Sequence, residues 1–128
     1  MRTMMILAGA LALTGCASGP NIAPPPAGFD AAASEFTGWV RVRGEEFQLY
    51  ASEERLRRGG ATPCVSGALP RNAQRAAHDL NGMKVRLFGR TRPWSEQAGP
   101  LMDLQGSEVQ NLCRRDVVIE ADRVEVIR

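Results

Sequence analysis

Apolar and polar side chains alternate over a short stretch in the first half of the chain. Val40 and Val42 fall on one side of an extended backbone, and Phe47 and Leu49 resume that side after the charged turn at 44–46. Alternation with a period of two is typical of strands that bury one face. The stretch therefore predicts a β-hairpin.

The segments that follow show other patterns. The charged, glycine-bearing residues 52–63 predict a loop, and residues 64–69 predict a third strand. Between Asn72 and Gly82 the apolar period becomes helical, with Asn72 as the expected N-cap and Asn81-Gly82 as a left-handed stop. The apolar stripe of this short helix consists of Ala73, Ala76, Ala77 and Leu80.

A period of two returns in the second half of the chain. Val85 and Leu87 face inward on a fourth predicted strand. The last predicted strand, 117–127, changes the parity of its inward residues near Asp122, which predicts a β-bulge or bend there. The connection between these strands, 93–112, shows little periodicity and is long for a compact domain.

The order of these elements resembles that of an OB-fold, in which one helix lies between the third and fourth strands of a barrel. The passage Leu80-Asn81-Gly82-Met83-Lys84-Val85-Arg86-Leu87-Phe88-Gly89 looks like the helix end and fourth strand of such domains. The resemblance spans residues 37–127 and implies a β-rich α+β domain built on a small, OB-like, five-stranded barrel. A small α+β sandwich with an antiparallel sheet would give the same pattern.

In an OB-fold the connection between the fourth and fifth strands often lines the ligand groove. Residues 93–112 take that place here. The alternative interpretation is that this connection caps the barrel with its own apolar residues and is held at its end by Cys113.

The first fifteen residues have a composition of their own. Arg2 precedes an apolar stretch at 4–13, which is far shorter than the roughly 20 residues that span a bilayer as a helix. A basic start, a short apolar stretch and small residues at its end are typical of a removable signal peptide.

The four residues Leu13-Thr14-Gly15-Cys16 resemble the lipobox of bacterial lipoproteins. The resemblance implies cleavage before Cys16, a diacylglyceryl group on its sulfur and a further acyl chain such as palmitate on its new amino group. Two or three chains hold a protein stably at a membrane. Ala17 stands where lipoproteins kept at the inner membrane often carry Asp, which implies the outer membrane, facing the periplasm. An ordinary secretory signal with a chance cysteine is the alternative.

The chain therefore divides into three parts. Residues 1–15 are the predicted signal peptide, and residues 16–35 are a lipidated, proline- and alanine-rich tether, stiffened at 24–26. Residues 36–128 are enough for one small domain and too few for two.

Charge and motifs exclude several classes of function. Loss of Arg2 with the signal leaves fifteen basic residues against fourteen acidic ones. The remaining chain is therefore close to neutral, and its net charge does not point to any class of partner. His78 is the only histidine, and the sequence holds no nucleophile elbow, zinc pattern, P-loop or dinucleotide turn. The pair Glu45-Glu46 lies in a turn, where solvation is expected. We expect no catalytic residues, no metal, no cofactor and no nucleic-acid partner.

Two cysteines, Cys64 and Cys113, remain after Cys16 takes its lipid. An even pair in an oxidising compartment predicts a disulfide, and closing a loop of about fifty residues is worth about 4 kcal/mol on the chain-entropy model. A redox or metal-binding thiol pair is the alternative, but the spacing is not Cys-x-x-Cys.

Cations and aromatic rings would share one surface if the first and fourth strands are neighbours. Such a surface suits an anionic ligand, because cations neutralise its charge while rings stack on its sugars. In an envelope the ligand would be an anionic glycan or a lipid headgroup. Glu120 and Asp122 also face outward and would instead form cross-strand ion pairs with these arginines. The predicted ligand-binding residues are Trp39, Arg41, Arg43, Lys84, Arg86, Phe88, Arg90 and Arg92.

Three functions follow from these patterns. The first is a non-enzymatic envelope lipoprotein that contacts a protein partner, and the second is a binder of an anionic glycan or lipid headgroup. The third is a redox protein that cycles the Cys64 and Cys113 thiols.

Overall fold

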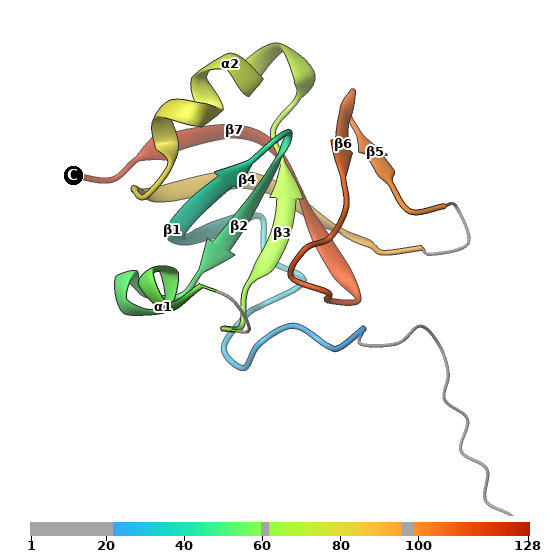
Figure 1. Cartoon of the computed structure of the whole chain (residues 1–128), viewed down its shortest axis with the longest axis horizontal. Helices are drawn as coiled ribbons and strands as arrows, with labels where there is room; N and C mark the ends of the chain where they lie inside the picture. The colour runs from blue at the N-terminus through green and yellow to red at the C-terminus, as the bar shows by residue number, and fades with distance from the viewer. Residues whose placement is uncertain (1–21, 60–61, 96–98) are drawn as a thin grey trace, which may run out of the picture.

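The computed structural model describes residues 22–59, 62–95 and 99–128. Five strands form its main sheet, namely β1 (Glu35–Arg43), β2 (Glu46–Tyr50), β3 (Val65–Ala68), β4 (Lys84–Pro93) and β7 (Val117–Val126). They close into a barrel in the order β1-β2-β3-β7-β4, with β4 pairing back to β1 (Figure 1). Neighbouring strands are antiparallel except β3 and β7, which are parallel.

This is the OB-like barrel that the sequence pattern predicts. Closure excludes the sandwich alternative, because every one of these strands has a hydrogen-bonded neighbour on both sides. The inward side chains predicted from the alternation form the core, where Val40, Leu49, Val85 and Leu87 are buried together with Ile119.

A short helical segment covers one end of the barrel, at the top of Figure 1. It consists of η1 (Arg71–Ala73), α2 (Gln74–Ala77) and η2 (His78–Leu80). Leu80 joins the core and Gly82 ends the segment with φ +87°, as predicted. The prediction of Asn72 as the N-cap is wrong, because the helical turns begin directly after Pro70. The proline ring holds φ near the helical value, so the turn starts two residues earlier.

The prediction of a loop at 52–63 is wrong in its first half. Residues Glu53–Arg58 form a helix, α1, whose Ser52 hydroxyl accepts a hydrogen bond from the amide of Arg55 at 3.2 Å. Glu53 and Glu54 in the first turn interact favourably with the positive end of the helix dipole. Leu56 is buried against the barrel. The cap and the burial of Leu56 therefore favour a helix where the composition predicts a loop.

The connection 93–112 contains a small sheet that its weak periodicity does not predict. Strands β5 (Met102–Leu104) and β6 (Ser107–Val109) pair as a hairpin. Leu104 and Val109 are fully buried in a second core with Ala68 and Val118, on the outside of the barrel. The connection therefore caps the barrel with its own apolar residues, as the second interpretation proposed.

The predicted bulge in the last strand is confirmed. Phe88 pairs with Arg123 and Gly89 with Ala121, so Asp122 is the extra residue of β7. At Gly89 a Cβ atom would overlap the backbone of β7, so the two strands approach closely only because this residue has no side chain.

The described part of the predicted tether packs against the barrel. Ala23 forms an isolated parallel bridge with Arg115, and the ring of Phe29 stacks on that of Phe36 at 5.4 Å between centroids. In Figure 1 this segment runs beneath the barrel, at the end opposite α2. The predicted signal peptide and Cys16 lie outside the described residues.

Candidate functional site

The two strands that carry the predicted ligand-binding face are neighbours. Trp39 on β1 lies opposite Lys84 on β4, and the Lys84 ammonium is 4.9 Å from the centroid of the Trp39 ring. Arg86 reaches the carboxylates of Glu35 and Glu125 at 3.7 and 3.6 Å. The predicted juxtaposition of β1 and β4 is therefore correct, and part of its charge is paired within the face.

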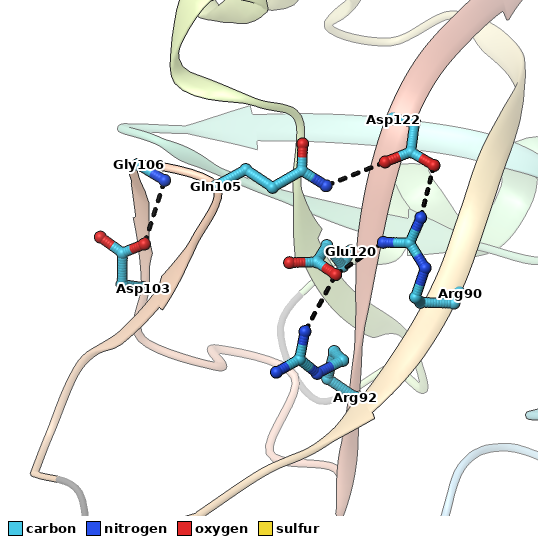
Figure 2. Close-up of polar contacts among 7 residues, drawn as sticks. All are labelled: Arg90, Arg92, Asp103, Gln105, Gly106, Glu120 and Asp122. Atoms are coloured by element: carbon cyan, nitrogen blue, oxygen red, sulfur yellow. Dashed lines mark hydrogen bonds and ion pairs between the residues drawn. The ribbon is translucent and has the colours of Figure 1, made fainter.

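Beyond the bulge, the remaining cations of β4 form a shared cluster with the acidic residues of β7. Figure 2 shows Arg90 between Glu120 and Asp122, at 2.6 and 2.5 Å, while Arg92 reaches the same Glu120 oxygen at 3.1 Å. The Glu120 side chain is only 9% exposed. The cross-strand ion pairs that the sequence allowed are thus present.

The charges of this cluster stabilise one another. The hydrogen bond to Glu120 raises the pKa of the Arg90 guanidinium above its ordinary value. The pKa of Asp122 is lowered, first by a hydrogen bond from the Gln105 side chain at 2.9 Å and then by Arg90 (Figure 2). An anion arriving here would have to displace carboxylates that already hold these cations.

The other predicted residues lie apart from the cluster. Arg41 donates to the Leu56 carbonyl at 2.8 Å and lies 6.0 Å from the centroid of the Tyr50 ring. Phe88 is covered by the guanidinium of Arg123, 3.8 Å from its ring centroid. Arg43 is the last residue of β1 and is exposed beside the β1–β2 turn. The fold therefore separates the eight predicted side chains instead of assembling them into one site.

The outer face of β2 and β3, where OB-folds bind ligands, is occupied by the chain's own residues 110–113. The carboxylate of Glu46 accepts hydrogen bonds from the backbone amides of Gln110, Asn111 and Leu112, at 2.7, 3.0 and 2.8 Å. Glu46 is 3% exposed, so the prediction that it is solvated is wrong. The sequence has no local signal for this contact, because the partners lie more than sixty residues away.

A disulfide fixes the end of this segment. Cys64 and Cys113 are bonded, with their Cα atoms 5.4 Å apart, which confirms the predicted pair. The amide of Cys113 also donates to the Ser66 hydroxyl at 3.0 Å. The segment is thus held by a carboxylate at one end and by a covalent bond at the other.

A cleft borders this segment, and we call it the Leu112 cleft. It consists of two recesses of about 390 and 180 Å³ that share Arg43 and Leu112. The side chain of Leu101 lines the larger recess, and Glu45 closes one side of it by accepting from the amide of Glu108 at 2.8 Å. The cleft lies between the β1–β2 turn and the β4–β7 connection, the two loops that flank the ligand groove of an OB-fold.

Two of the three large apolar side chains that are exposed in the described part of the chain meet in this cleft. Leu112 is 48% exposed and Leu101 is 37% exposed. The third, Met83 at 36%, follows the short helical segment and does not line the cleft. From the sequence, only the connection 93–112 as a whole could be expected to line a groove. Neither leucine was predicted as a site residue, because neither lies in a periodic pattern.

Other features bear on chemistry. Over residues 22–59, 62–95 and 99–128, no group of three or more His, Cys, Asp and Glu side chains is placed to hold a metal ion. No helix among these residues is long and apolar enough to cross a membrane. Comparison of the chain with protein-family models, curated proteins and solved structures returns no match.

Proposed function

We propose that the protein is a lipid-anchored interaction module of the bacterial envelope that binds a protein partner through the Leu112 cleft. The observation that carries this proposal is the convergence of Leu101 and Leu112, both well exposed, on one cleft. Protein interfaces combine an apolar centre with a polar rim, and the rim here is formed by Arg43, Glu45 and Glu108.

The rigidity of the cleft favours binding. The Leu112 amide is held by Glu46, and the next residue is fixed by the disulfide. A preformed apolar side chain loses little conformational entropy when a partner covers it. In the larger recess the carboxylates of Glu45 and Glu108 outnumber the guanidinium of Arg43, whereas Arg41 lines the smaller recess. The larger recess therefore favours a partner segment with an apolar side chain next to a cation.

The proposed anchor is the lipid on Cys16. It is supported by the lipobox-like residues before that cysteine, and the Cys64–Cys113 disulfide is the kind of bond that forms and persists in an oxidising compartment such as the periplasm. Ala17 favours the outer membrane over the inner one. The partner is then an envelope protein.

The other two functions have less support. An anionic glycan or lipid headgroup on the β1–β4 face would compete with the carboxylates that pair with Arg86, Arg90 and Arg92. Redox cycling would break the bond that holds residues 110–113 in place.

Site-specific photo-crosslinking in intact cells tests the cleft. A photoreactive residue at Leu112 or Leu101 should give a discrete adduct with one envelope protein. Met83 is the matched control, because its exposed fraction is almost the same as that of Leu101. A Leu112→Asp substitution should abolish the adduct formed from position 101. Equal adducts from all three positions, or none from the two leucines, would refute the proposed site.

Mass and location test the anchor. The purified protein should begin at Cys16 and carry acyl mass, and it should leave the membrane fraction when the change Cys16→Ser is made. A full-length, unacylated protein would refute the proposed anchor and leave the cleft to be judged by its crosslinks.

A further inference from the structure

The point where the chain joins the barrel is fixed in space. The amide of Ala23 donates to the Arg114 carbonyl at 3.0 Å, and the amide of Asp116 donates back to the Ala23 carbonyl at 2.7 Å. The Arg115 guanidinium adds a bond to the Pro24 carbonyl at 3.0 Å. Residues 22–24 are therefore part of the folded unit.

The distance from this point to the proposed lipid is short. Cys16 and Ile22 are six residues apart, and six residues reach about 20 Å at most, whatever their conformation. A domain of about one hundred residues has a radius of gyration of about 13 Å, so its diameter exceeds the length of these six residues. The end of the barrel that holds Ile22 must therefore lie nearer the bilayer than the end covered by α2 (Figure 1).

The side chains at this end have the chemistry of a membrane surface. An open recess of about 420 Å³ is lined by Ile22, Trp94, Pro100 and Arg114, together with polar groups. Tryptophan is enriched at the boundary of lipid and water, and arginine pairs with phosphate. Arg114 is exposed, and no carboxylate of the described residues lies within 4.0 Å of its guanidinium.

We propose that this anchor-proximal end, defined by Ile22, Trp94, Pro100 and Arg114, rests on the surface of an anionic phospholipid bilayer. Arg114 contacts headgroup phosphates. Trp94 is partly buried against the second core, and its exposed part lies at the level of the headgroups. The inference rests on the proposed lipid on Cys16, which limits how far the domain can move away. It also places the Leu112 cleft close to the membrane, because Gln110 lines both the cleft and this recess.

Tryptophan quenching on vesicles tests this orientation. The protein purified from membranes is reconstituted into vesicles of phosphatidylethanolamine and phosphatidylglycerol that carry a headgroup nitroxide. The chain has two tryptophans, so Trp39→Phe isolates Trp94 and Trp94→Phe isolates Trp39. We expect Trp94, which lines the recess, to be quenched more strongly than Trp39, which does not line it.

Charge reversal supplies the matched control. Arg114→Glu should weaken the quenching of Trp94, because one arginine near an anionic surface is worth about fivefold in the binding equilibrium. Arg75→Glu makes the same change on α2, at the opposite end, and should leave the quenching unchanged. Circular dichroism of each variant establishes that it is folded.

The outcomes separate the two proposals. Acylated protein whose Trp94 is quenched no more than Trp39, or whose quenching is insensitive to Arg114→Glu, would overturn the orientation and leave the anchor standing. Protein without acyl mass that does not bind the vesicles would overturn the anchor and the orientation with it. Equal quenching in vesicles of phosphatidylcholine alone would overturn the role of anionic headgroups.

Discussion

Replacing Glu46 with alanine should destabilise this protein severely, although the residue lies beside a turn. One carboxylate oxygen accepts from the amides of Gln110 and Asn111, and the other accepts from the amide of Leu112 and from the side chain of Gln48. The substitution removes the acceptor for all four donors at once. It also leaves the segment that covers β2 attached only at its end, by the disulfide and by the hydrogen bond from Cys113 to Ser66.

The magnitude follows from the number of bonds. A hydrogen bond to a charged group contributes about 1.5 to 3 kcal/mol, and three backbone donors lose theirs when the carboxylate is removed. Water can reach part of the exposed segment and replace some of the loss, so we expect about 3 to 5 kcal/mol. That is a large share of the roughly 5 to 15 kcal/mol typical of a small domain.

Urea unfolding followed by circular dichroism measures this effect, with the disulfide intact. Glu45→Ala is the matched control, because Glu45 is exposed and accepts from one backbone amide only, that of Glu108. It should cost about 1 kcal/mol. Glu46→Gln should fall between the two, since its amide group would face the Leu112 and Gln48 donors. If Glu46→Ala cost no more than Glu45→Ala, the structural role of this carboxylate would be refuted.

Three further predictions concern the remaining constraints of the fold. Changing Cys64 and Cys113 to Ser should lower the free energy of unfolding by about 2 to 4 kcal/mol, measured in urea, and a loss below a few tenths would contradict the role of the bridge. Gln105→Ala should raise the depressed pKa of Asp122, followed by NMR titration. Because that pKa is depressed in the folded state, its contribution to stability is present above the unfolded-state pKa and is lost as the pH falls through the folded-state pKa; an unchanged titration would contradict the assigned cause. Gly89→Ala should cost about 1 to 3 kcal/mol or more in thermal unfolding, because its Cβ meets the backbone of β7, and a neutral effect would show that the strands can separate there.

Much of the barrel could be predicted from periodicity. The hairpin of β1 and β2, the strand β4 and the position of the short helix follow from which side chains face the core. The bulge at Asp122 followed from a change of parity in one strand. These features can be recognised locally. A strand places every second side chain on its buried face, and a helix does so about every 3.6 residues, so the pattern is visible in neighbouring residues. Helix α1 and the β5–β6 hairpin escaped prediction, because both are short and most of their burial comes from distant contacts.

The candidate site was predictable only in pieces. Composition and alternation identified the cations and rings of β1 and β4, and the adjacency of these strands was correct. Their grouping was not predictable, since it depends on which carboxylates of β7 lie across from them after the bulge. The Leu112 cleft arises where a turn and a connection from opposite halves of the chain meet.

The sequence by itself determined the strand faces, the bulge and the cysteine pair, because periodicity and oxidation chemistry act through the residues themselves. It also predicts the lipid anchor, which mass spectrometry will test. Only the tertiary structure decided that Glu46 is buried, that Leu101 and Leu112 share a cleft and that residues 22–24 belong to the folded unit. Each of these depends on contacts between segments that are far apart in the chain. The surroundings of such a side chain are set by which distant segments the fold brings beside it, and not by its neighbours in sequence.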